Sequence, residues 1–258
     1  KAIFLFRSWI NGPGGTKKLH GSYPFAKIEN RPAPLSFVKL LLSAQIYYFC
    51  NTNLGAVNHS ANLRFANNHS IGGAPFYAGA QEESLCRCST LLPCLKAMEI
   101  PFYKKHIDMY NARKMDFMGN DDLIYTPDVV VFKSDKRTVP VHPEMLEESE
   151  WFKVNIITCA APQLTYSQTR PDNYETVVSG RVKKILDVAA SEKNEVIILG
   201  AWGCGAFCNP IEIVAKTFVE QLKNYNFRVV EFALATTEDI SDNIFNRVPL
   251  ERYTVSPD

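Results

Sequence analysis

The stretch EVIILGAWGCGAFCNPIEIVAKTFVEQLKNYNFRVVEFALA, residues 195–235, decides the fold class. Residues 195–200 end in an unbroken apolar run, which is typical of a strand buried on both faces. Residues 210–225 carry apolar side chains at helical spacing, and residues 228–235 form a second strand-like run. A strand, a helix and another strand in succession are the repeating unit of α/β proteins, so we predict a sheet covered by helices.

The same alternation extends toward the N-terminus. Polar residues 103–127, which are of mixed charge, predict surface loop with a short helix. Strands that alternate with helices in this way predict an α/β three-layer sandwich. The further predicted elements are strands over residues 57–66, 128–132 and 154–160 and helices over residues 79–91 and 174–191.

The N-terminal part of the chain differs in texture. We expect residues 1–54 to form an extension beside a core of residues 55–258. Residues 1–33 are rich in glycine, proline and polar residues, which predicts loop and irregular structure. Residues 35–50 predict a buried accessory helix. This apolar stretch contains Lys39 and is shorter than the roughly 20 residues that a membrane-spanning helix needs.

The composition excludes several classes of protein. Lys and Arg number 28 and Asp and Glu number 27, so the formal net charge of +1 argues against a basic surface for nucleic acid or an anionic membrane. With 46% hydrophobic and 12% aromatic residues, the chain has the composition of a folded protein rather than a disordered one. We therefore expect a compact monomer that binds neither nucleic acid nor membrane.

The seven cysteines predict free thiols in a reducing compartment, because an odd number in a chain of 258 residues does not indicate a disulfide framework. We expect a cytoplasmic protein, with secretion into a host cell left open. Cys86, Cys88 and Cys94 lie close together in the sequence but form no Cys-x-x-Cys pair. We therefore predict no metal site and no cofactor.

The segment LGAWGCGAFCNP, residues 199–210, is the first of two candidate sites. A strand ends, a loop of small residues follows, and a helix begins with Asn209 as its N-cap and Pro210 at its first position. Successive backbone N–H groups in such a loop form an anion-binding nest that holds a phosphate without a basic side chain. The alternative is a tight packing turn with Trp202 and Phe207 as core anchors.

The segment FANNHSIGGAPFYAGAQEE, residues 65–83, is the second candidate site. A strand gives way to a loop in which Gly72 and Gly73 allow a ligand to approach the backbone closely. Glu82 and Glu83 follow on the first turn of a helix, about 100° apart around its axis. One carboxylate can therefore point into a cleft while its neighbour lies at the rim. The alternative is that both acids only complement the helix dipole.

Both segments lie beyond the carboxyl ends of predicted strands, where α/β sheets bind ligands. Over residues 55–235 they resemble the macrodomain superfamily, and in particular its microbial-type poly(ADP-ribose) glycohydrolase family. That family carries a glycine triplet, a Gln-Glu-Glu signature and a Gly-x-Trp-Gly-Cys-Gly-Ala-Phe loop. Residues 72–74, 81–83 and 200–207 stand in these places, and Ala160-Ala161-Pro162 looks like the family's strand ending.

The resemblance implies a macrodomain-like three-layer α/β/α sandwich with a mixed central sheet and an N-terminal accessory helix. It implies ADP-ribose, or an ADP-ribosylated protein or polymer, as the partner. The implied activity is that of a glycoside-type hydrolase of O- or N-linked ADP-ribose. Three alternatives are a non-catalytic ADP-ribose reader, a mono-ADP-ribosyl-protein hydrolase acting, for example, on arginine-linked ADP-ribose, and a structural or partner-binding domain without a ligand.

The resemblance also implies roles for single residues. Glu83 would be the catalytic acid, and Glu82 its neighbour that hydrogen-bonds the ribose hydroxyls. The sequence departs from the family pattern at Ala74, the third position of the triplet, and at Ser70-Ile71, where Asn-Pro is expected. Both departures fall on the side of the distal ribose. The implied ligand-binding residues are Asn67, Gly72, Gly73, Ala74, Gln81, Gly203, Cys204, Gly205, Ala206 and Phe207.

Overall fold

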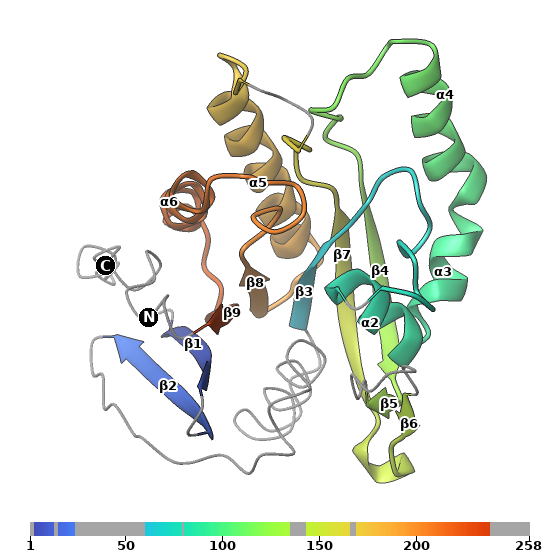
Figure 1. The fold of residues 1–258 in the computed structure, drawn as a ribbon. Helices are drawn as coiled ribbons and strands as arrows, with labels where there is room; N and C mark the ends of the chain where they lie inside the picture. Colours follow the sequence, from blue (N-terminus) through green and yellow to red (C-terminus); the bar gives the residue numbers. More distant parts are fainter. Residues whose placement is uncertain are drawn as a thin grey trace.

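The computed structural model describes residues 3–12, 15–23, 60–78, 80–134, 143–165 and 169–237 (Figure 1). The accessory helix predicted over residues 35–50 lies outside the described residues. The strands are β1 (Ile3–Gly12), β2 (Gly15–Tyr23), β3 (Ser60–Phe65), β4 (Leu123–Val131), β5 (Lys133–Ser134), β6 (Glu144–Met145), β7 (Phe152–Cys159), β8 (Val196–Gly200) and β9 (Val229–Thr237). The helices are α2 (Gln81–Cys88), α3 (Leu91–Ala97), the π-helix η2 (Glu99–Lys104), α4 (Lys105–Asn111), the 3₁₀ turn η3 (Glu148–Glu150), α5 (Tyr174–Ser191) and α6 (Ile211–Leu222).

Seven strands form one mixed sheet in the order β2-β1-β9-β8-β3-β7-β4. The five inner strands run parallel, while β2 and β4 are antiparallel to their neighbours at the two edges. Strands β5 and β6 form a separate hairpin. A mixed central sheet flanked by helices confirms the predicted α/β fold class.

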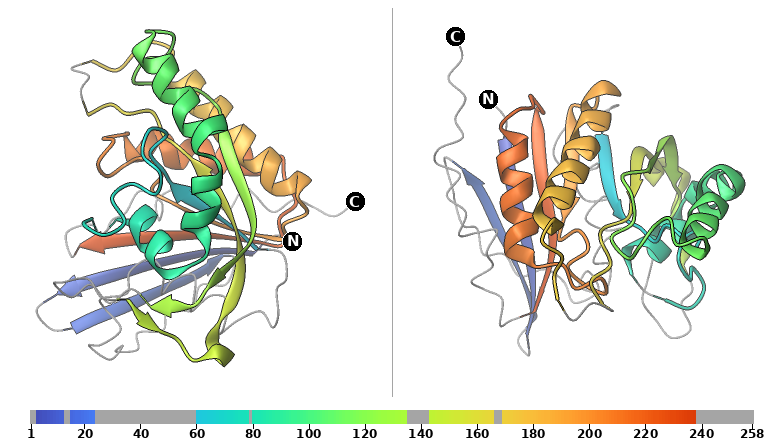
Figure 2. Two further views of the ribbon diagram at one scale, coloured as in Figure 1. Left: turned by 90° about the vertical axis from the view of Figure 1, so that its right-hand side faces the viewer. Right: turned by 90° about the horizontal axis from the view of Figure 1, so that it is seen from above.

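Helices cover both faces of the sheet, which gives three layers (Figure 2). Ile197 and Leu199 of β8 pack in one apolar core with α5 and α6. Val196 and Ile198 of the same strand pack in a second core with α2, α3 and η2. The unbroken apolar run therefore has the burial on both faces that the sequence predicts. No helix in the described part of the chain is long and apolar enough to cross a membrane.

The prediction of loop and irregular structure over residues 1–33 is wrong for most of these residues. Strands β1 and β2 form an antiparallel hairpin, and β1 also pairs in parallel with β9 from Ile3–Val229 to Asn11–Thr237. Residues 3–10, IFLFRSWI, are rich in side chains that favour strands. The glycines stand at the hairpin end, where Gly12 pairs with Gly15. The division of the chain after residue 54 stays a prediction.

Two internal elements also differ from expectation. The helix predicted over residues 79–91 is two helices, because Ser89 is extended and forms a β-bridge with Val131. Pro93 lies in the first turn of α3, where a missing N–H costs little. The strand predicted over residues 128–132 is the longer β4, which continues past Pro127 through a bulge because an edge strand tolerates both.

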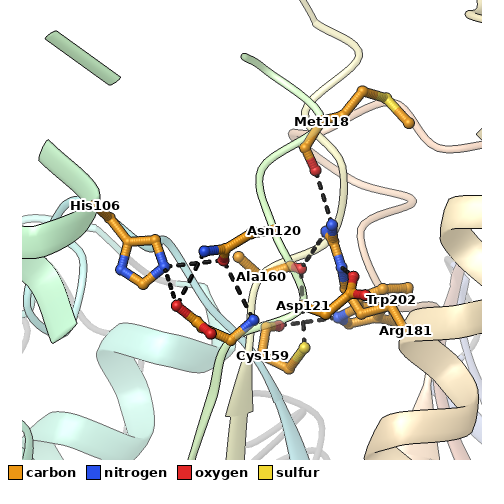
Figure 3. Close-up of polar contacts among 9 residues, drawn as sticks. His106, Met118, Asn120, Asp121, Cys159, Ala160, Arg181 and Trp202 are labelled. Atoms are coloured by element: carbon orange, nitrogen blue, oxygen red, sulfur yellow. Dashed lines mark hydrogen bonds and ion pairs between the residues drawn. The ribbon is translucent and has the colours of Figure 1, made fainter. Parts of the chain in front are cut away.

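The loops at the carboxyl edge of the sheet are tied together by buried polar contacts (Figure 3). Arg181 of α5 is 1% exposed and donates to Ala160 O at 3.0 Å, to Met118 O at 2.9 Å and to Asp121 Oδ1 at 3.2 Å. Trp202 Nε1 donates to Cys159 O at 3.0 Å. The segments that follow β7 and β8 are therefore fixed to each other and to the chain that precedes β4.

We predict that Arg181→Met lowers the free energy of unfolding by about 3 kcal/mol, because two buried carbonyl oxygens lose their donors. Urea denaturation measures this loss. Lys184→Met, on an exposed position of the same helix, is the matched control and should change stability by less than about 0.5 kcal/mol. Equal stability of the two variants would contradict the bracing role.

Candidate functional site

Two loops meet at the carboxyl edge of the sheet. Residues 66–80 follow β3 and residues 201–210 follow β8, and these two strands pair in parallel. Parallel neighbours end at the same edge, so the two candidate segments lie where α/β folds bind ligands. The segment after β7, residues 160–165, lies beside them because β7 also pairs with β3.

Glu82 is held by a buried ion pair. It is 6% exposed, and its Oε1 contacts Nη2 of Arg64, a residue of β3 whose side chain is 0% exposed. Its Oε2 accepts a hydrogen bond from the backbone N–H of Asn67 at 3.0 Å. Burial raises the pKa of Glu82 to about 7, because the Arg64 charge and the Asn67 N–H offset only part of the cost of desolvating the carboxylate.

Glu83 lies beside this pair with one oxygen free. Its Oε1 accepts a hydrogen bond from the backbone N–H of Ala74 at 3.2 Å. Its Oε2 is buried and has no hydrogen-bond partner among the described residues. Gly73, at φ +66°, lies against this carboxylate, and a Cβ there would overlap Glu83 Oε1. A buried carboxyl oxygen without a partner is uncommon and needs a reason such as a ligand.

The other residues predicted on this side have structural contacts. Asn67 Oδ1 accepts from the His69 N–H at 2.7 Å, so the Asn67 side chain stabilises its own turn. Gln81 Nε2 donates to Leu63 O at 3.4 Å and ties the start of α2 to β3. Gly72, at φ +70°, packs against Cys86, whose Sγ would lie 2.9 Å from an added Cβ. These contacts hold the carboxylates in place and do not by themselves indicate a ligand.

The loop after β8 is fixed from below by Asn209, which is 4% exposed. Asn209 Nδ2 donates to Pro162 O at 2.7 Å and to Gly203 O at 2.9 Å, and its Oδ1 accepts from Tyr174 OH at 2.8 Å. The prediction that Asn209 caps α6 is therefore wrong. Pro210 is the N-cap, and the Asn209 amide binds three separate segments because a buried amide must satisfy its donors and acceptor.

The upper side of this loop presents backbone N–H groups. Those of Gly203, Gly205, Ala206 and Phe207 have no acceptor among the residues that the structure describes. Ala206 O accepts from Thr165 Oγ1 and Phe207 O accepts from the Leu164 N–H at 2.9 Å. In a trans peptide the N–H points opposite to the preceding C=O, so the Phe207 N–H points away from residue 165. Several backbone donors without an acceptor in one short loop are typical of an anion site.

Gly203 allows this loop to lie close to its neighbours. Its φ is +72°, and an added Cβ would overlap Ala161 Cβ and Asn209 Nδ2. Gly205 differs, because a Cβ there would meet nothing within 4 Å. Cys204 is half-buried, and its Sγ contacts Trp202 O at 3.6 Å. The described residues contain no cluster of His, Cys, Asp and Glu that could hold a metal ion.

Comparison with known proteins gives one family and a set of solved structures. The family model described as microbial-type PARG, catalytic domain, matches residues 42–134, which include the carboxylate pair of α2. A search of the curated proteins gave no match.

The solved structures are those of poly(ADP-ribose) glycohydrolases (PARG). The protein from Thermomonospora curvata, bound to the inhibitor ADP-HPD, is 31% identical with a TM-score of 0.61, and the alignment covers 76% of this chain and 70% of the other. The protein from Deinococcus radiodurans, in complex with ADP-ribose, is 30% identical with a TM-score of 0.65, and the alignment covers 83% and 82%. This chain belongs to the microbial-type PARG family.

Membership of the microbial-type PARG family confirms the resemblance, whereas the roles of single residues stay predictions. Arg64 and Arg87 are site residues that the sequence did not indicate. Arg64 stands between Leu63 and Phe65 in the predicted strand, and a charge between two apolar residues is the one signal that could have pointed to a buried guanidinium. Arg87 Nη1 donates to Pro75 O and Ala78 O at 2.6 Å and so holds the loop before α2.

We predict a large loss of stability for one glycine variant of the loop after β8 and almost no change for another. Gly203→Ala should lower the free energy of unfolding by at least about 2 kcal/mol, because it combines a left-handed backbone with a steric overlap. Gly205→Ala should change it by less than about 0.5 kcal/mol. Chemical denaturation of both variants measures the difference. A stable Gly203→Ala variant would contradict the close packing of this loop.

We predict a pH-dependent contribution of Glu82 to stability. The folded-state pKa of about 7 lies above the unfolded value of 4.5, so the contribution is present below pH 4.5 and is lost as the pH rises through about 7. The total loss is about 3 kcal/mol. The free energy of unfolding of the wild type should therefore fall between pH 4.5 and 8, whereas that of Glu82→Gln should not. The exposed variant Glu99→Gln is the control and should behave like the wild type. A difference in unfolding free energy between the wild type and Glu82→Gln that stays constant over this pH range would contradict the raised pKa of Glu82.

Proposed function

We propose that this protein is an ADP-ribosyl hydrolase of the poly(ADP-ribose) glycohydrolase type. It binds ADP-ribose at the carboxyl edge of the sheet and cleaves the ribosyl bond to a polymer or a modified protein. The observation that carries the proposal is the buried Oε2 of Glu83, which has no hydrogen-bond partner among the described residues and lies next to the Arg64–Glu82 pair. The family relatives bound to ADP-ribose and to ADP-HPD support the choice of ligand.

The N–H groups of the loop after β8 that have no acceptor in the described part of the chain supply the binding site for the diphosphate. Gly203, Gly205, Ala206 and Phe207 each offer one donor, and the ring of Phe207 packs at the margin of the core, in reach of the adjoining ribose. Backbone donors bind an anion without a cationic side chain. This explains how a chain with a net charge of +1 binds a dianionic ligand.

The two carboxylates divide the chemistry. The glycosidic bond breaks through an oxocarbenium-like transition state, as in other glycoside hydrolases. Protonated Glu83 donates its proton to the leaving oxygen, and the resulting carboxylate then activates a water molecule. Glu82 accepts hydrogen bonds from the ribose hydroxyls and is kept in position by Arg64 and by the Asn67 N–H. A fixed ribose holds the reacting carbon beside Glu83.

Ala74 supports a hydrolase rather than a reader that binds without cleaving. The third position of the glycine triplet does not need a glycine here, because Ala74 is not among the described residues with positive φ. Its side chain is exposed and its N–H still reaches Glu83. The departure from the family pattern therefore leaves the catalytic carboxylate in place. Cleavage of mono-ADP-ribosylated protein, for example on arginine, is the second candidate. The loop from Gly73 to Gln81 departs from the family pattern in composition, and a different acceptor would be accommodated there.

We further propose that the enzyme acts as a cytoplasmic monomer and needs neither a cofactor nor a metal. The cysteines in the described ranges are all free thiols, which fits a reducing compartment. The net charge fits a partner that is neither nucleic acid nor membrane.

We predict that Glu83→Gln reduces release of ADP-ribose from auto-modified polymer by about 10²- to 10⁴-fold, because the amide cannot transfer the proton. The affinity for ADP-ribose, measured by calorimetry, should stay within a few-fold of the wild type. Serine-linked and arginine-linked mono-ADP-ribosyl proteins are assayed in parallel, and the exposed variant Glu99→Gln is the control. Unchanged turnover in Glu83→Gln would overturn the assignment of the acid. Binding without release by the wild type would favour the reader.

A further inference from the structure

The loop between the glycines and α2 presents two exposed aromatic rings. Phe76 is 73% exposed and Tyr77 is 92% exposed, which makes them the most exposed large apolar side chains among the described residues. Burial of large aromatic side chains is energetically favourable. Two neighbouring exposed rings therefore indicate a surface that a binding partner covers.

This loop is held in a defined shape. The N–H groups of Tyr77 and Ala78 donate to Ala74 O at 3.0 and 2.9 Å and close a turn. Arg87, which is 8% exposed, clamps the same turn from below through Pro75 O and Ala78 O, both at 2.6 Å. The turn is therefore attached to the catalytic helix α2 at two carbonyl groups. The two rings are carried by a fixed backbone.

The backbone that carries the two rings lies close to the acid that acts on the leaving group. Ala74, at the start of the turn, donates its N–H to Glu83 Oε1 at 3.2 Å. Phe76 is two residues further on, which limits its Cα to about 7 Å from that of Ala74. In the proposed mechanism Glu83 protonates the leaving oxygen, and the diphosphate binds on a different loop, after β8. The turn with Phe76 and Tyr77 therefore borders the leaving group.

The composition of the loop indicates the kind of leaving group. Residues 65–80 contain no Lys, Arg, Asp or Glu, and the guanidinium of Arg87, which donates to Pro75 O and Ala78 O, is buried beneath the turn. Residues 65–80 therefore offer no opposite charge to a charged peptide acceptor. Uncharged aromatic rings instead suit a planar nucleobase, which stacks on them whatever its hydrogen-bonding pattern.

We propose that Phe76 and Tyr77 form a stacking platform for the adenine of the polymer unit that leaves. In poly(ADP-ribose) the ribose that carries the leaving oxygen also carries an adenine, so the base departs from the side of the bond that this turn borders. The inference rests on the proposed function, because it uses Glu83 as the acid. It identifies the polymer as the substrate that the loop favours over a modified amino-acid side chain.

The test compares two substrates with one pair of substitutions. Phe76→Ala/Tyr77→Ala should lower kcat/KM for poly(ADP-ribose) about tenfold or more, through KM, because stacking on one or two rings is lost. Release from a serine-linked mono-ADP-ribosyl peptide, which has no base on the leaving side, and the Kd for ADP-ribose should change less than twofold. The conservative pair Phe76→Tyr/Tyr77→Phe should restore polymer cleavage. Ile100→Ala, which removes another side chain that is 68% exposed, is the control.

Equal losses on both substrates, or no loss on either, would overturn the platform while leaving the hydrolase intact. Failure of the wild type to release ADP-ribose from any substrate would instead contradict the proposed function. In that case, dissociation constants test the platform. The wild type should bind polymer about tenfold more tightly than ADP-ribose, and the double alanine variant should lose that difference. Equal wild-type affinities for polymer and ADP-ribose would overturn it.

Discussion

The buried ion pair between Arg64 and Glu82 is the constraint on which the site depends. A guanidinium that is 0% exposed must face an anionic or strongly polar partner, because its charge has left water. Strand β3 supplies Arg64, and the first turn of α2 supplies Glu82. The pair therefore fixes the rotation of α2 about its own axis. Once Glu82 faces Arg64, Glu83 must face another direction, and it lies against Gly73 and the Ala74 N–H.

The second half of the site is built from backbone rather than charge. Asn209 and Trp202 bind the loop after β8 to the segments beneath it, and Arg181 braces the chain that follows β7. Every one of these side chains is buried and donates to main-chain carbonyls. Within the loop, the carbonyls of Gly203, Ala206 and Phe207 accept hydrogen bonds from Asn209, Thr165 and Leu164. The N–H groups of Gly205, Ala206 and Phe207 have no acceptor among the described residues. Preorganised donors need little rearrangement when an anion binds.

Elements with a strong local pattern could be predicted from the sequence, whereas contacts between distant residues could not. Helix α5 begins and ends at the predicted residues because its apolar side chains recur at a regular helical interval. Strands β1 and β2 were not predicted, because the glycines and prolines between and after them dominate the local composition and are typical of loops. The two carboxylates and both loops follow from motifs. Arg64 and Asn209 do not, because their partners lie 18 and 47 residues away in the chain.

A crystal structure of the Glu83→Gln variant with ADP-ribose tests most directly whether these two halves form one site. We predict that the diphosphate oxygens accept hydrogen bonds from the N–H groups of Gly205, Ala206 and Phe207. The hydroxyls of the distal ribose should contact Glu82 while its anomeric carbon faces residue 83. A diphosphate bound elsewhere, or a distal ribose turned away from α2, would contradict it.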